Sequence, residues 1–404
     1  MDRDLQGNQL MSSKKKILLI CDANLPRAPR VRMAYEALKE DFHFTMAGYD
    51  APPYQDVDYI RLPKKKKAAR KSITWHLGYP AIFRKFFSVF VKIYLKATAQ
   101  KEDKRSIKDQ YISLFNNVDC DLIINHHLNT LEMAVALKER LGVPLVSNLH
   151  EYYPREFEDQ EVWLKYEAPK KLFICQTFLP KADKVFSVCE GIKQEYLANF
   201  GVDSIVIRND KPYQNIEPKT LDPDGPIRLI HHGAALRSRK LHHLIEAVAG
   251  LEGFELDLML LPTQQDYFDE LKDQSSRCAN INIVQAVMPD QIIEFISNYD
   301  VGVYILEPTN FNQQMALPNK LFEFIQARLA IAITPNEEMA RIVNEYELGE
   351  VSKDYTPSSF RELLSELDHN SISRFKVNAN KHARELSSEV TQQTIRDTIK
   401  QLVQ

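Results

Sequence analysis

The sequence predicts an α/β protein that consists of two doubly wound parallel sheets, each covered by helices on both faces. Short apolar runs alternate with helical patterns in two separate series along the chain. Between the series, residues 209–226 contain four prolines and no periodicity, which is typical of a linker. The length of 404 residues also exceeds one typical core. We therefore expect one domain at 14–208 and another at 227–370.

The first series begins with an apolar run at 16–21, as expected for a strand that is buried on both faces. Further strands are expected at 42–47, 121–125, 143–151, 184–189 and 204–208, and helices at 31–39, 130–141 and 190–200. No G-x-G-x-x-G follows the first strand, which argues against a dinucleotide cofactor in this domain. The series predicts a Rossmann-like sheet.

The second series predicts another Rossmann-like sheet. Its strands are expected at 227–231, 255–261, 281–284, 301–306 and 329–333. Its helices are expected at 241–249, 265–274 and 289–297, and from Pro318 onward after a polar loop at 307–314. Towards the ends of the chain, we expect residues 1–13 to be a disordered leader and residues 371–404 to be an amphipathic helical tail.

The composition excludes several classes of protein. Hydrophobic residues make up 44% of the chain and charged residues 26%, as in soluble globular proteins. No run of 18 apolar residues is present, so we expect no spanning helix. The five cysteines are scattered and include no C-x-x-C pair, which favours a reducing compartment and argues against a thiolate metal site.

The net charge of −3 conceals a strongly basic segment at 61–105. This segment has fourteen Lys or Arg residues against Glu102 and Asp103, and aromatic residues are interspersed among them. Cations beside aromatic rings suit anionic lipid headgroups, but they also suit nucleic acid. An ordinary solvated helix is the third alternative. We favour an anionic membrane surface as the partner, and we predict no nucleic-acid partner.

The segment from Pro318 to Phe324 has the residues of a phosphate- and sugar-binding helix start. Proline is favoured at the first position of a helix, and Lys320 and Glu323 then share one side of the first turn. Free N–H groups and the helix dipole attract phosphate at this end. Lys320 could neutralise a phosphate, and Glu323 could accept hydrogen bonds from sugar hydroxyls. The alternative is a surface ion pair, which would stabilise the helix by about 0.2–0.5 kcal/mol.

A basic loop follows the first strand of the second domain. Gly233 permits a tight turn, and Arg237, Arg239 and Lys240 precede the next helix. Guanidinium and ammonium groups at such a place suit a pyrophosphate. A solvated basic loop is the alternative, and the sequence leaves open which basic residue would contact the ligand.

Histidines stand at the carboxyl ends of two strands in the first domain. His150 and Glu151 follow one strand, and the adjacent His126 and His127 follow another. Neighbouring strand residues point to opposite faces, so we expect at most one of His126 and His127 to face a ligand cleft between the domains. A core histidine bound to backbone is the alternative for His150. Three D-x-D triplets are what chance supplies in an acidic chain, and we predict no metal site.

These segments, taken in order, closely resemble glycosyltransferases of family 4, which have the GT-B fold. The matching segments are the PRV loop at 26–32, the D-x-I-x-x-H…GVPLV unit at 121–146, the HE-x-x-P loop at 150–154, the basic loop at 232–240 and the PNK-x-x-E helix at 316–324. The resemblance implies two Rossmann-like domains that face each other across a cleft, with the C-terminal helix returning to the N-terminal domain.

The resemblance also implies an activity. A hexosyl group would move, with retention of configuration, from a nucleotide-diphosphate sugar to a saccharide or lipid-linked acceptor. No metal or other cofactor is expected. We expect a cytoplasmic enzyme, peripheral on the inner face of the plasma membrane, that serves cell-surface polysaccharide or glycolipid synthesis. A sugar-nucleotide epimerase of the same fold and a non-catalytic GT-B binding module are the alternatives.

The resemblance assigns roles to twelve residues. The catalytic residues would be His150, Arg239 and Lys240; the donor-binding residues Gly233, Arg237, Asn319, Lys320 and Glu323; and the acceptor-side residues Arg27, Arg30, His127 and Glu151. The chain departs from the family at Met315, where many members have the first glutamate of Glu-x7-Glu. Arg328 and Ala330 also replace the usual Gly and Pro after the helix, which puts sugar specificity in doubt.

Overall fold

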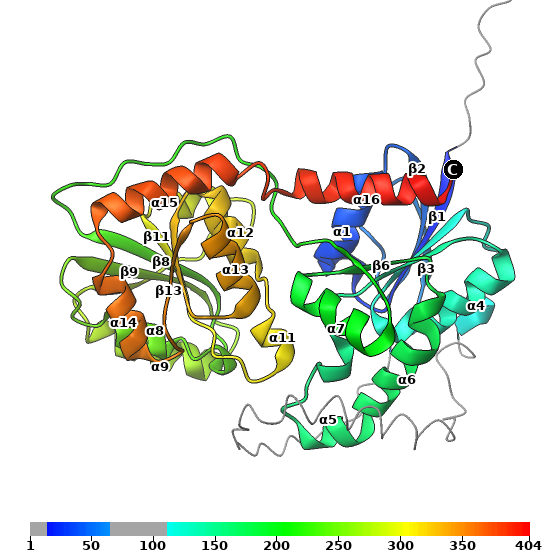
Figure 1. The fold of residues 1–404 in the computed structure, drawn as a ribbon, viewed down its shortest axis with the longest axis horizontal. Helices are drawn as coiled ribbons and strands as arrows, with labels where there is room; N and C mark the ends of the chain where they lie inside the picture. The colour runs from blue at the N-terminus through cyan, green and yellow to red at the C-terminus, as the bar shows by residue number, and fades with distance from the viewer. Residues whose placement is uncertain (1–13, 65–110) are drawn as a thin grey trace, which may run out of the picture. The chain divides into compact units, whose positions relative to one another are not determined.

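The computed structural model describes residues 14–64 and 111–404. The predicted leader and all but the first four residues of the basic segment 61–105 lie outside the described residues. Two parallel sheets are present, one with the strand order β3-β2-β1-β4-β5-β6-β7 and one with the order β10-β9-β8-β11-β12-β13. Both orders run outward from a central strand in two directions, so the prediction of two Rossmann-like doubly wound sheets is confirmed (Figure 1).

The seven-stranded sheet is built from the first half of the chain. Its strands are β1 Lys15–Cys21, β2 Phe42–Gly48, β3 Val57–Arg61, β4 Leu122–His126, β5 Leu145–Asn148, β6 Lys184–Ser187 and β7 Ile205–Val206. Its helices are α1 Pro29–Leu38, α4 Leu131–Leu141, α5 Glu161–Tyr166, α6 Ala168–Phe178 and α7 Glu190–Phe200. β1 pairs with β2 and β4 and is buried from Ile17 to Cys21, which explains why that run is apolar throughout.

The six-stranded sheet is built from the second half. Its strands are β8 Ile227–Ala234, β9 Phe254–Leu261, β10 Ile281–Val284, β11 Val301–Tyr304, β12 Ala330–Ile333 and β13 Gly349–Val351. The helices are α8 His242–Val248, α9 Gln265–Ser276, α10 Ile292–Ile296, α11 Phe311–Gln314, α12 Asn319–Gln326, α13 Glu337–Glu345, α14 Pro357–Ser365, α15 His369–His382 and α16 Ser388–Leu402. The successive residues Leu229 and Ile230 of β8 enter different cores, one with α8, α9 and α14 and the other with α12 and α13.

A glycine brings α12 close to the six-stranded sheet. A Cβ atom at Gly302, in β11, would lie 2.4 Å from Cγ of Phe324 in α12, so only glycine leaves room for the ring. Phe324 is 1% exposed. This contact fixes the position of the helix whose first turn carries Lys320 and Glu323.

Several elements differ from the sequence-based expectation. The predicted polar loop 307–314 contains α11, whose cap is the side chain of Asn310 accepting a hydrogen bond from Gln313 N. The helix expected at 289–297 is reduced to α10, Ile292–Ile296. The short strands β3 and β13 and the helices α5, α6, α13 and α14 were not predicted.

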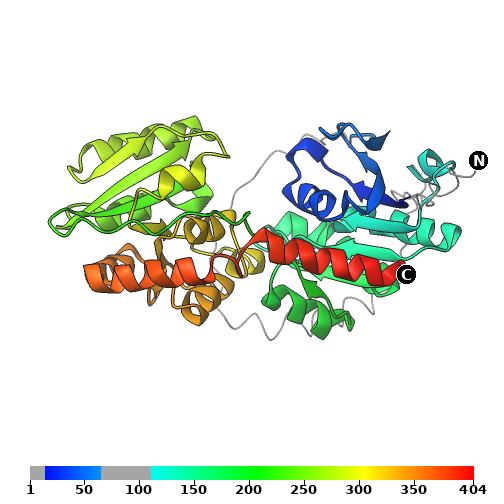
Figure 2. The same ribbon diagram turned by 90° about the horizontal axis from the view of Figure 1, so that it is seen from above.

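By backbone contacts the chain divides into two compact units. The first comprises residues 1–150, 171–186 and 395–404, and the second comprises 151–170 and 187–394. The end of α16 therefore belongs to the unit that holds β1, and the predicted return of the C-terminal helix to the N-terminal domain is confirmed (Figure 1; Figure 2).

Side chains of α16 attach its end to α1 and the loop that follows α1. Arg396 Nε donates a hydrogen bond to Ala37 O at 3.0 Å, and Lys400 Nζ lies 2.8 Å from Asp41 Oδ2. A hydrogen bond and an ion pair thus hold the end of α16 in the first unit.

Residues 209–226 form no helix and no named strand, but their first part is bound to the second unit. Lys211 forms an isolated parallel bridge with Ser387. Gln214 N donates to Gln326 Oε1 at 3.0 Å, and Gln214 O accepts from Arg328 NH2 at 2.6 Å. The domain boundaries expected from the sequence remain predictions.

Candidate active site

Lys320 is a buried cation in the first turn of α12. Its side chain lies over the ring of Tyr304, at the end of β11, with Nζ 5.0 Å from the ring centroid. The residue is 8% exposed. Burial, with a further contribution from the Arg239 guanidinium, lowers the pKa of Lys320 to about 7, while Glu323 acts in the opposite direction. A bound anion would reverse this shift, because it would stabilise the charged form.

Gly233 makes room for two cations at the end of β8. Its φ angle is +133°, a conformation that favours glycine. A Cβ atom there would lie 2.7 Å from Lys320 Nζ and 3.4 Å from Arg239 NH1. The absence of a side chain at this position is what lets Lys320 and Arg239 approach the same stretch of backbone.

Glu323 lies one turn further along α12, between two side chains from other elements. Its Oε1 is 2.9 Å from Nζ of Lys211, and its Oε2 is 3.3 Å from Nε2 of His232, outside hydrogen-bonding geometry. Burial, followed by the charges of Lys320 and Lys211, lowers the pKa of His232 to about 3, so this imidazole is neutral. Lys211 therefore supplies the countercharge. Asn319, at the start of the helix, accepts a hydrogen bond from Asn209 Nδ2 through its Oδ1.

The three basic residues after Gly233 have different surroundings. Arg237 is exposed and binds Glu270 at 2.7 Å and Asp266 at 3.3 Å. Lys240 Nζ is 2.6 Å from Glu307 Oε2. Arg239 is half-buried and is the residue that approaches the Lys320 site. The structure thus brings Gly233, Arg239 and Lys320 together and directs Arg237 towards α9.

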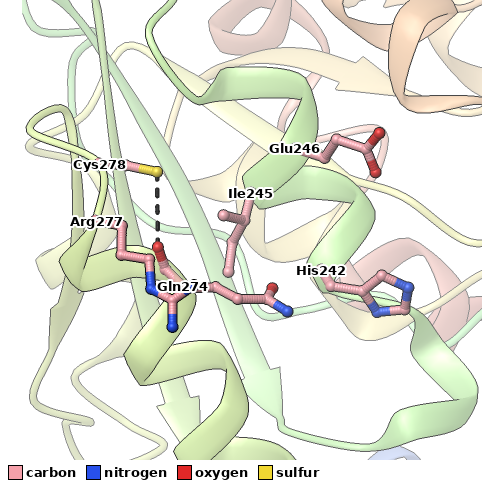
Figure 3. Close-up of a pocket in the computed structure, with 6 residues that line it drawn as sticks. All are labelled: His242, Ile245, Glu246, Gln274, Arg277 and Cys278. Carbon is pink, nitrogen blue, oxygen red and sulfur yellow. Dashed lines mark hydrogen bonds between the residues drawn. The ribbon is translucent and has the colours of Figure 1, made fainter.

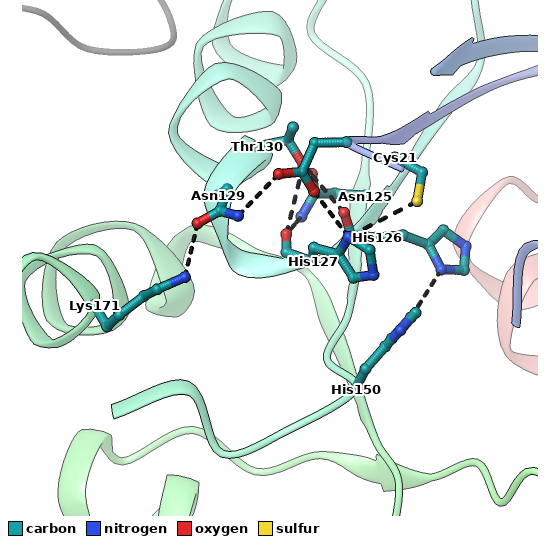
Figure 4. Close-up of polar contacts among 9 residues, drawn as sticks. Cys21, Asn125, His126, His127, Asn129, Thr130, His150 and Lys171 are labelled. Atoms are coloured by element: carbon teal, nitrogen blue, oxygen red, sulfur yellow. Dashed lines mark hydrogen bonds and ion pairs between the residues drawn. The ribbon is translucent and has the colours of Figure 1, made fainter. Parts of the chain in front are cut away.

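The first unit holds a second cluster at the carboxyl ends of β4 and β5 (Figure 4). Arg30, in α1, is 5% exposed and donates from NH2 to Asn148 Oδ1 at 3.0 Å. Nδ1 of His126 lies 3.2 Å from Nε2 of His150. Burial, with Arg30 and His127 adding to it, holds the pKa of His150 well below its ordinary value.

His127 differs from its neighbours because it is a cation. Its Nδ1 lies 2.8 Å from Asp22 Oδ1 and 3.9 Å from Cys21 Sγ. Burial lowers its pKa, but the hydrogen bonds with Asp22 and Cys21 outweigh burial and raise the pKa to about 10. The φ angle of His127 is +72°, so the chain leaves the strand alternation at this residue.

His126 and His127 both lie beside His150, while the expectation that at most one of them faces the cleft stays a prediction. Ring centroids of His126 and His127 lie 5.5 and 4.5 Å from that of His150. Both rings can lie near His150 because β4 ends at His126 and the positive φ of His127 takes the next side chain out of the strand alternation.

The remaining predicted residues lie apart from these contacts. Arg27 is exposed at the end of the turn Leu25–Arg27. Glu151 belongs to the second unit, and its carbonyl accepts a hydrogen bond from Tyr196 OH at 2.9 Å. Met315, at the position of the missing glutamate, is buried, and its carbonyl accepts from Cys189 Sγ at 3.4 Å. A buried apolar side chain thus stands where many family members have the glutamate.

Sequence reasoning missed four residues that contact the predicted ones. They are Asp22, Asn148, Lys211 and His232. Asp22 and Asn148 stand at the carboxyl ends of strands, where polar residues are a usable signal. Lys211 has no such signal, since it lies in a stretch that was interpreted as a linker.

The part of the chain that the structure describes shows neither a metal site nor a spanning helix. There, no group of three or more His, Cys, Asp or Glu side chains could hold a metal ion, and no helix is long and apolar enough to cross a membrane. A pocket between α8 and α9 contains none of the predicted site residues (Figure 3). It is lined by His242, Ile245, Glu246, Gln274, Arg277 and Cys278.

Solved structures share this fold over nearly the whole chain. A glycosyltransferase from Rickettsia africae has a TM-score of 0.67 at 12% identity and covers 97% of this chain and 99% of its own. Sucrose-phosphate synthase from Thermosynechococcus elongatus has a TM-score of 0.65 at 15% identity, with coverages of 96% and 99%. Anabaena Alr3699/HepE in complex with UDP-glucose has a TM-score of 0.62 at 13% identity, with coverages of 96% and 100%. The fold is GT-B.

One family model matches part of the sequence. Residues 56–209 match the family model described as Glycosyltransferase Family 4. No curated protein sequence matches significantly. The chain has the GT-B fold and over residues 56–209 it is similar to Glycosyltransferase Family 4, so the resemblance stated from its motifs is confirmed.

Proposed function

We propose that the protein transfers a hexosyl group, with retention of configuration, from a nucleotide-diphosphate sugar to a saccharide or lipid-linked acceptor. The observation that carries the proposal is the burial of the Lys320 ammonium group without a hydrogen-bond acceptor among the described residues. Lys320 is nine-tenths buried and lies beside Arg239. In the part of the chain that the structure describes, its Nζ has no hydrogen-bond acceptor. A diphosphate would supply acceptors and neutralise both cations.

The chemistry of transfer requires stabilisation of the leaving diphosphate. Negative charge develops there as the bond to the sugar breaks, and preorganised cations in a water-poor site stabilise it strongly. Lys320 and Arg239 are suited to this role, and Lys240 could join them by leaving Glu307. These cations would provide the charge that a divalent metal ion otherwise supplies, so we propose metal-independent transfer, with turnover in excess EDTA as the check.

The other predicted residues complete the proposal. Glu323, which pairs with Lys211, would accept hydrogen bonds from the ribose hydroxyls, and Asn319 would contact the nucleotide. Gly233 would let the diphosphate approach the backbone. His150 would contact the transferred sugar, and the cluster around Arg30 and His127 would bind the acceptor. The printed titles of two neighbours, Anabaena Alr3699/HepE with UDP-glucose and with UDP and glucose, support such substrates by analogy.

A thermal-shift screen against UDP-, GDP- and ADP-sugars tests the proposal. A ligand at a hundred times its Kd stabilises a protein by about 2.7 kcal/mol, so the correct donor will raise Tm. We expect Glu323→Gln and Lys320→Met to abolish the shift while the unliganded variants stay folded. Absence of any shift with wild-type protein would favour a non-catalytic module. Conversion of the donor without an acceptor would favour an epimerase.

We predict that the two arginines of the basic loop, Arg237 and Arg239, contribute differently to donor binding. Arg239→Met will weaken binding of the donor by about tenfold or more, because a charge-assisted contact with the diphosphate is lost. Arg237→Met is the matched control. Its guanidinium already pairs with Glu270 and Asp266 at the surface, so we expect an effect below about threefold. Calorimetric titration of both variants measures the difference, and the reverse order would contradict the arrangement.

We further propose that the enzyme acts at the cytoplasmic face of the plasma membrane in cell-surface polysaccharide or glycolipid synthesis. The basic and aromatic character of residues 61–105 supports this location. Co-sedimentation with vesicles will require anionic lipid and will weaken as salt rises. Replacing Lys64–Lys67 by Gln will have the same effect as salt. Equal binding to neutral vesicles, or no binding at low salt, would reject the membrane role.

A further inference from the structure

His126 is linked to His150 by a hydrogen bond between two imidazole rings. Nδ1 of His126 and Nε2 of His150 are 3.2 Å apart (Figure 4). His126 is fully buried at the end of β4. Burial is the main cause that holds the pKa of both rings well below the ordinary value, and the cations Arg30 and His127 add to it. Both rings are therefore neutral at pH 7.

A hydrogen bond between two neutral imidazoles fixes the tautomer of each. One ring must donate a proton and the other must accept it, and the second nitrogen of each ring then has the opposite character. The bond between His126 and His150 therefore decides whether the other nitrogen of His150, Nδ1, is a donor or an acceptor.

The second nitrogen of His126 distinguishes the two arrangements. Nε2 of His126 is buried and has no hydrogen-bond partner among the described residues. If His150 donated, His126 would carry its own proton on Nε2, as a buried N–H without an acceptor. Such orphaned donors are rare in proteins because they lose a hydrogen bond to water and gain none. If His126 donates instead, only a lone pair is left unpaired there.

We propose that His126 is a positioning residue that donates from Nδ1 to Nε2 of His150 and thereby fixes His150 with its proton on Nδ1. In the described residues, Nδ1 of His150 has no hydrogen bond, and it is not among the buried unpaired atoms, so it is open to a ligand. If the proposed function holds, His150 meets its sugar as a neutral hydrogen-bond donor to a hydroxyl or ring oxygen. It cannot take up a proton through Nδ1.

Nitrogen NMR of protein labelled with ¹⁵N-histidine tests the tautomer directly. The chain has 11 histidines, and the His150→Gln variant identifies the signals of His150. We expect a protonated Nδ1 and an unprotonated Nε2 in His150, with a protonated Nδ1 in His126. A proton on Nε2 of His150 in wild-type protein, or a cationic His150, would overturn the proposal.

Two variants of His126 test whether it sets this state. His126→Phe keeps a ring but removes the donor, so the signals of His150 should change to a mixture of tautomers. His126→Asn retains an amide near the position of Nδ1 and should restore the single tautomer. The control is Ser147→Ala, which removes a buried hydroxyl of β5 that has no hydrogen-bond partner in the described residues. A single unchanged tautomer in folded His126→Phe would contradict the positioning role. If that variant does not fold, the wild-type and His126→Asn spectra still decide.

Kinetics provide a second readout that a purely structural role would not reproduce. We expect His126→Phe to lower kcat by about tenfold or more through misorientation of His150, with the Kd of the donor nucleotide unchanged, and His126→Asn to recover most of the loss. An equal loss in both variants would contradict the proposal. If no sugar nucleotide supports transfer, the proposed function fails, whereas the NMR result still stands or falls separately.

Discussion

At pH 8, binding of the nucleotide-diphosphate sugar will take up about 0.9 proton per site, because the pKa of Lys320 is about 7 in the free protein and will rise beside the diphosphate. A sugar nucleotide has both phosphates esterified, so the ligand itself does not titrate in this range. At pH 7 the uptake will be about half a proton. Above pH 7 the affinity will fall, approaching tenfold per pH unit. Calorimetric titrations in two buffers of different ionisation enthalpy measure the uptake.

Two variants control this experiment. Lys320→Met has no group to protonate and will bind weakly without uptake. Lys320→Arg keeps the charge at every accessible pH, so any binding that it retains should be independent of pH. Wild-type binding without proton uptake at pH 8 would show that Lys320 is not the group that meets the diphosphate.

The same shift has a consequence for stability. The pKa of Lys320 is lower in the folded protein than in the unfolded chain, where the ordinary value is 10.5. Between about pH 7 and 10.5 the unfolded state therefore binds more protons, and the contribution of Lys320 to stability rises with pH. Below pH 7 the buried charge destabilises the fold fully. Lys320→Met should therefore stabilise the unliganded protein more at pH 6 than at pH 9 in denaturant titrations.

Gly233→Ala will abolish donor binding. The new methyl group would overlap Lys320 Nζ at 2.7 Å and Cε at 2.9 Å, and it would stand in a backbone conformation that side chains rarely adopt. Lys320 must then move from its place over Tyr304, and the backbone strain costs about 1–3 kcal/mol. Thermal shift with and without the donor separates lost binding from lost stability.

Gly250→Ala is the matched control for backbone strain. Gly250 also has a positive φ, +64°, but a Cβ atom there would have no neighbour within 4 Å. We expect this variant to lose some stability and to retain the donor-induced shift. If both variants responded to the donor like wild-type protein, Gly233 would have no role in the donor site.

The sequence predicted those parts of the fold whose signals are local. The helix α7 begins and ends where it was expected, because Gly201 in the left-handed conformation ends it. The strand β1 was evident from its apolar run. In contrast, β13 has only three residues, of which the middle one, Glu350, is exposed, so it has no apolar run to detect. The helix α11 depends on the cap formed by Asn310, within a segment that looks like a polar loop.

In the candidate site, too, the sequence predicted the local features and missed those that depend on contacts between distant segments. That Lys320 and Glu323 share the first turn of α12 followed from helix periodicity. That Lys320 is buried, and therefore titrates near neutrality, depends on Tyr304 and Gly233, which come from two other strands. The contact of Lys211 with Glu323 joins segments far apart in the chain, and the positive φ of His127 has no marker in its residue type. Packing, which periodicity does not describe, determined each of these features.

The division of the chain into two units bears on the design of chimeras. Hybrid enzymes are simplest to make where two parts are joined once, since a single junction then exchanges one part whole. Here the chain passes from one unit to the other after residues 150, 170, 186 and 394. In a hybrid joined within 209–226, the tail 395–404 would therefore come from the same parent as the six-stranded sheet. Arg396 of that parent would then face the α1 of the other parent, in place of its own hydrogen-bond acceptor, Ala37 O. A working hybrid needs the last ten residues restored to the parent that supplies α1.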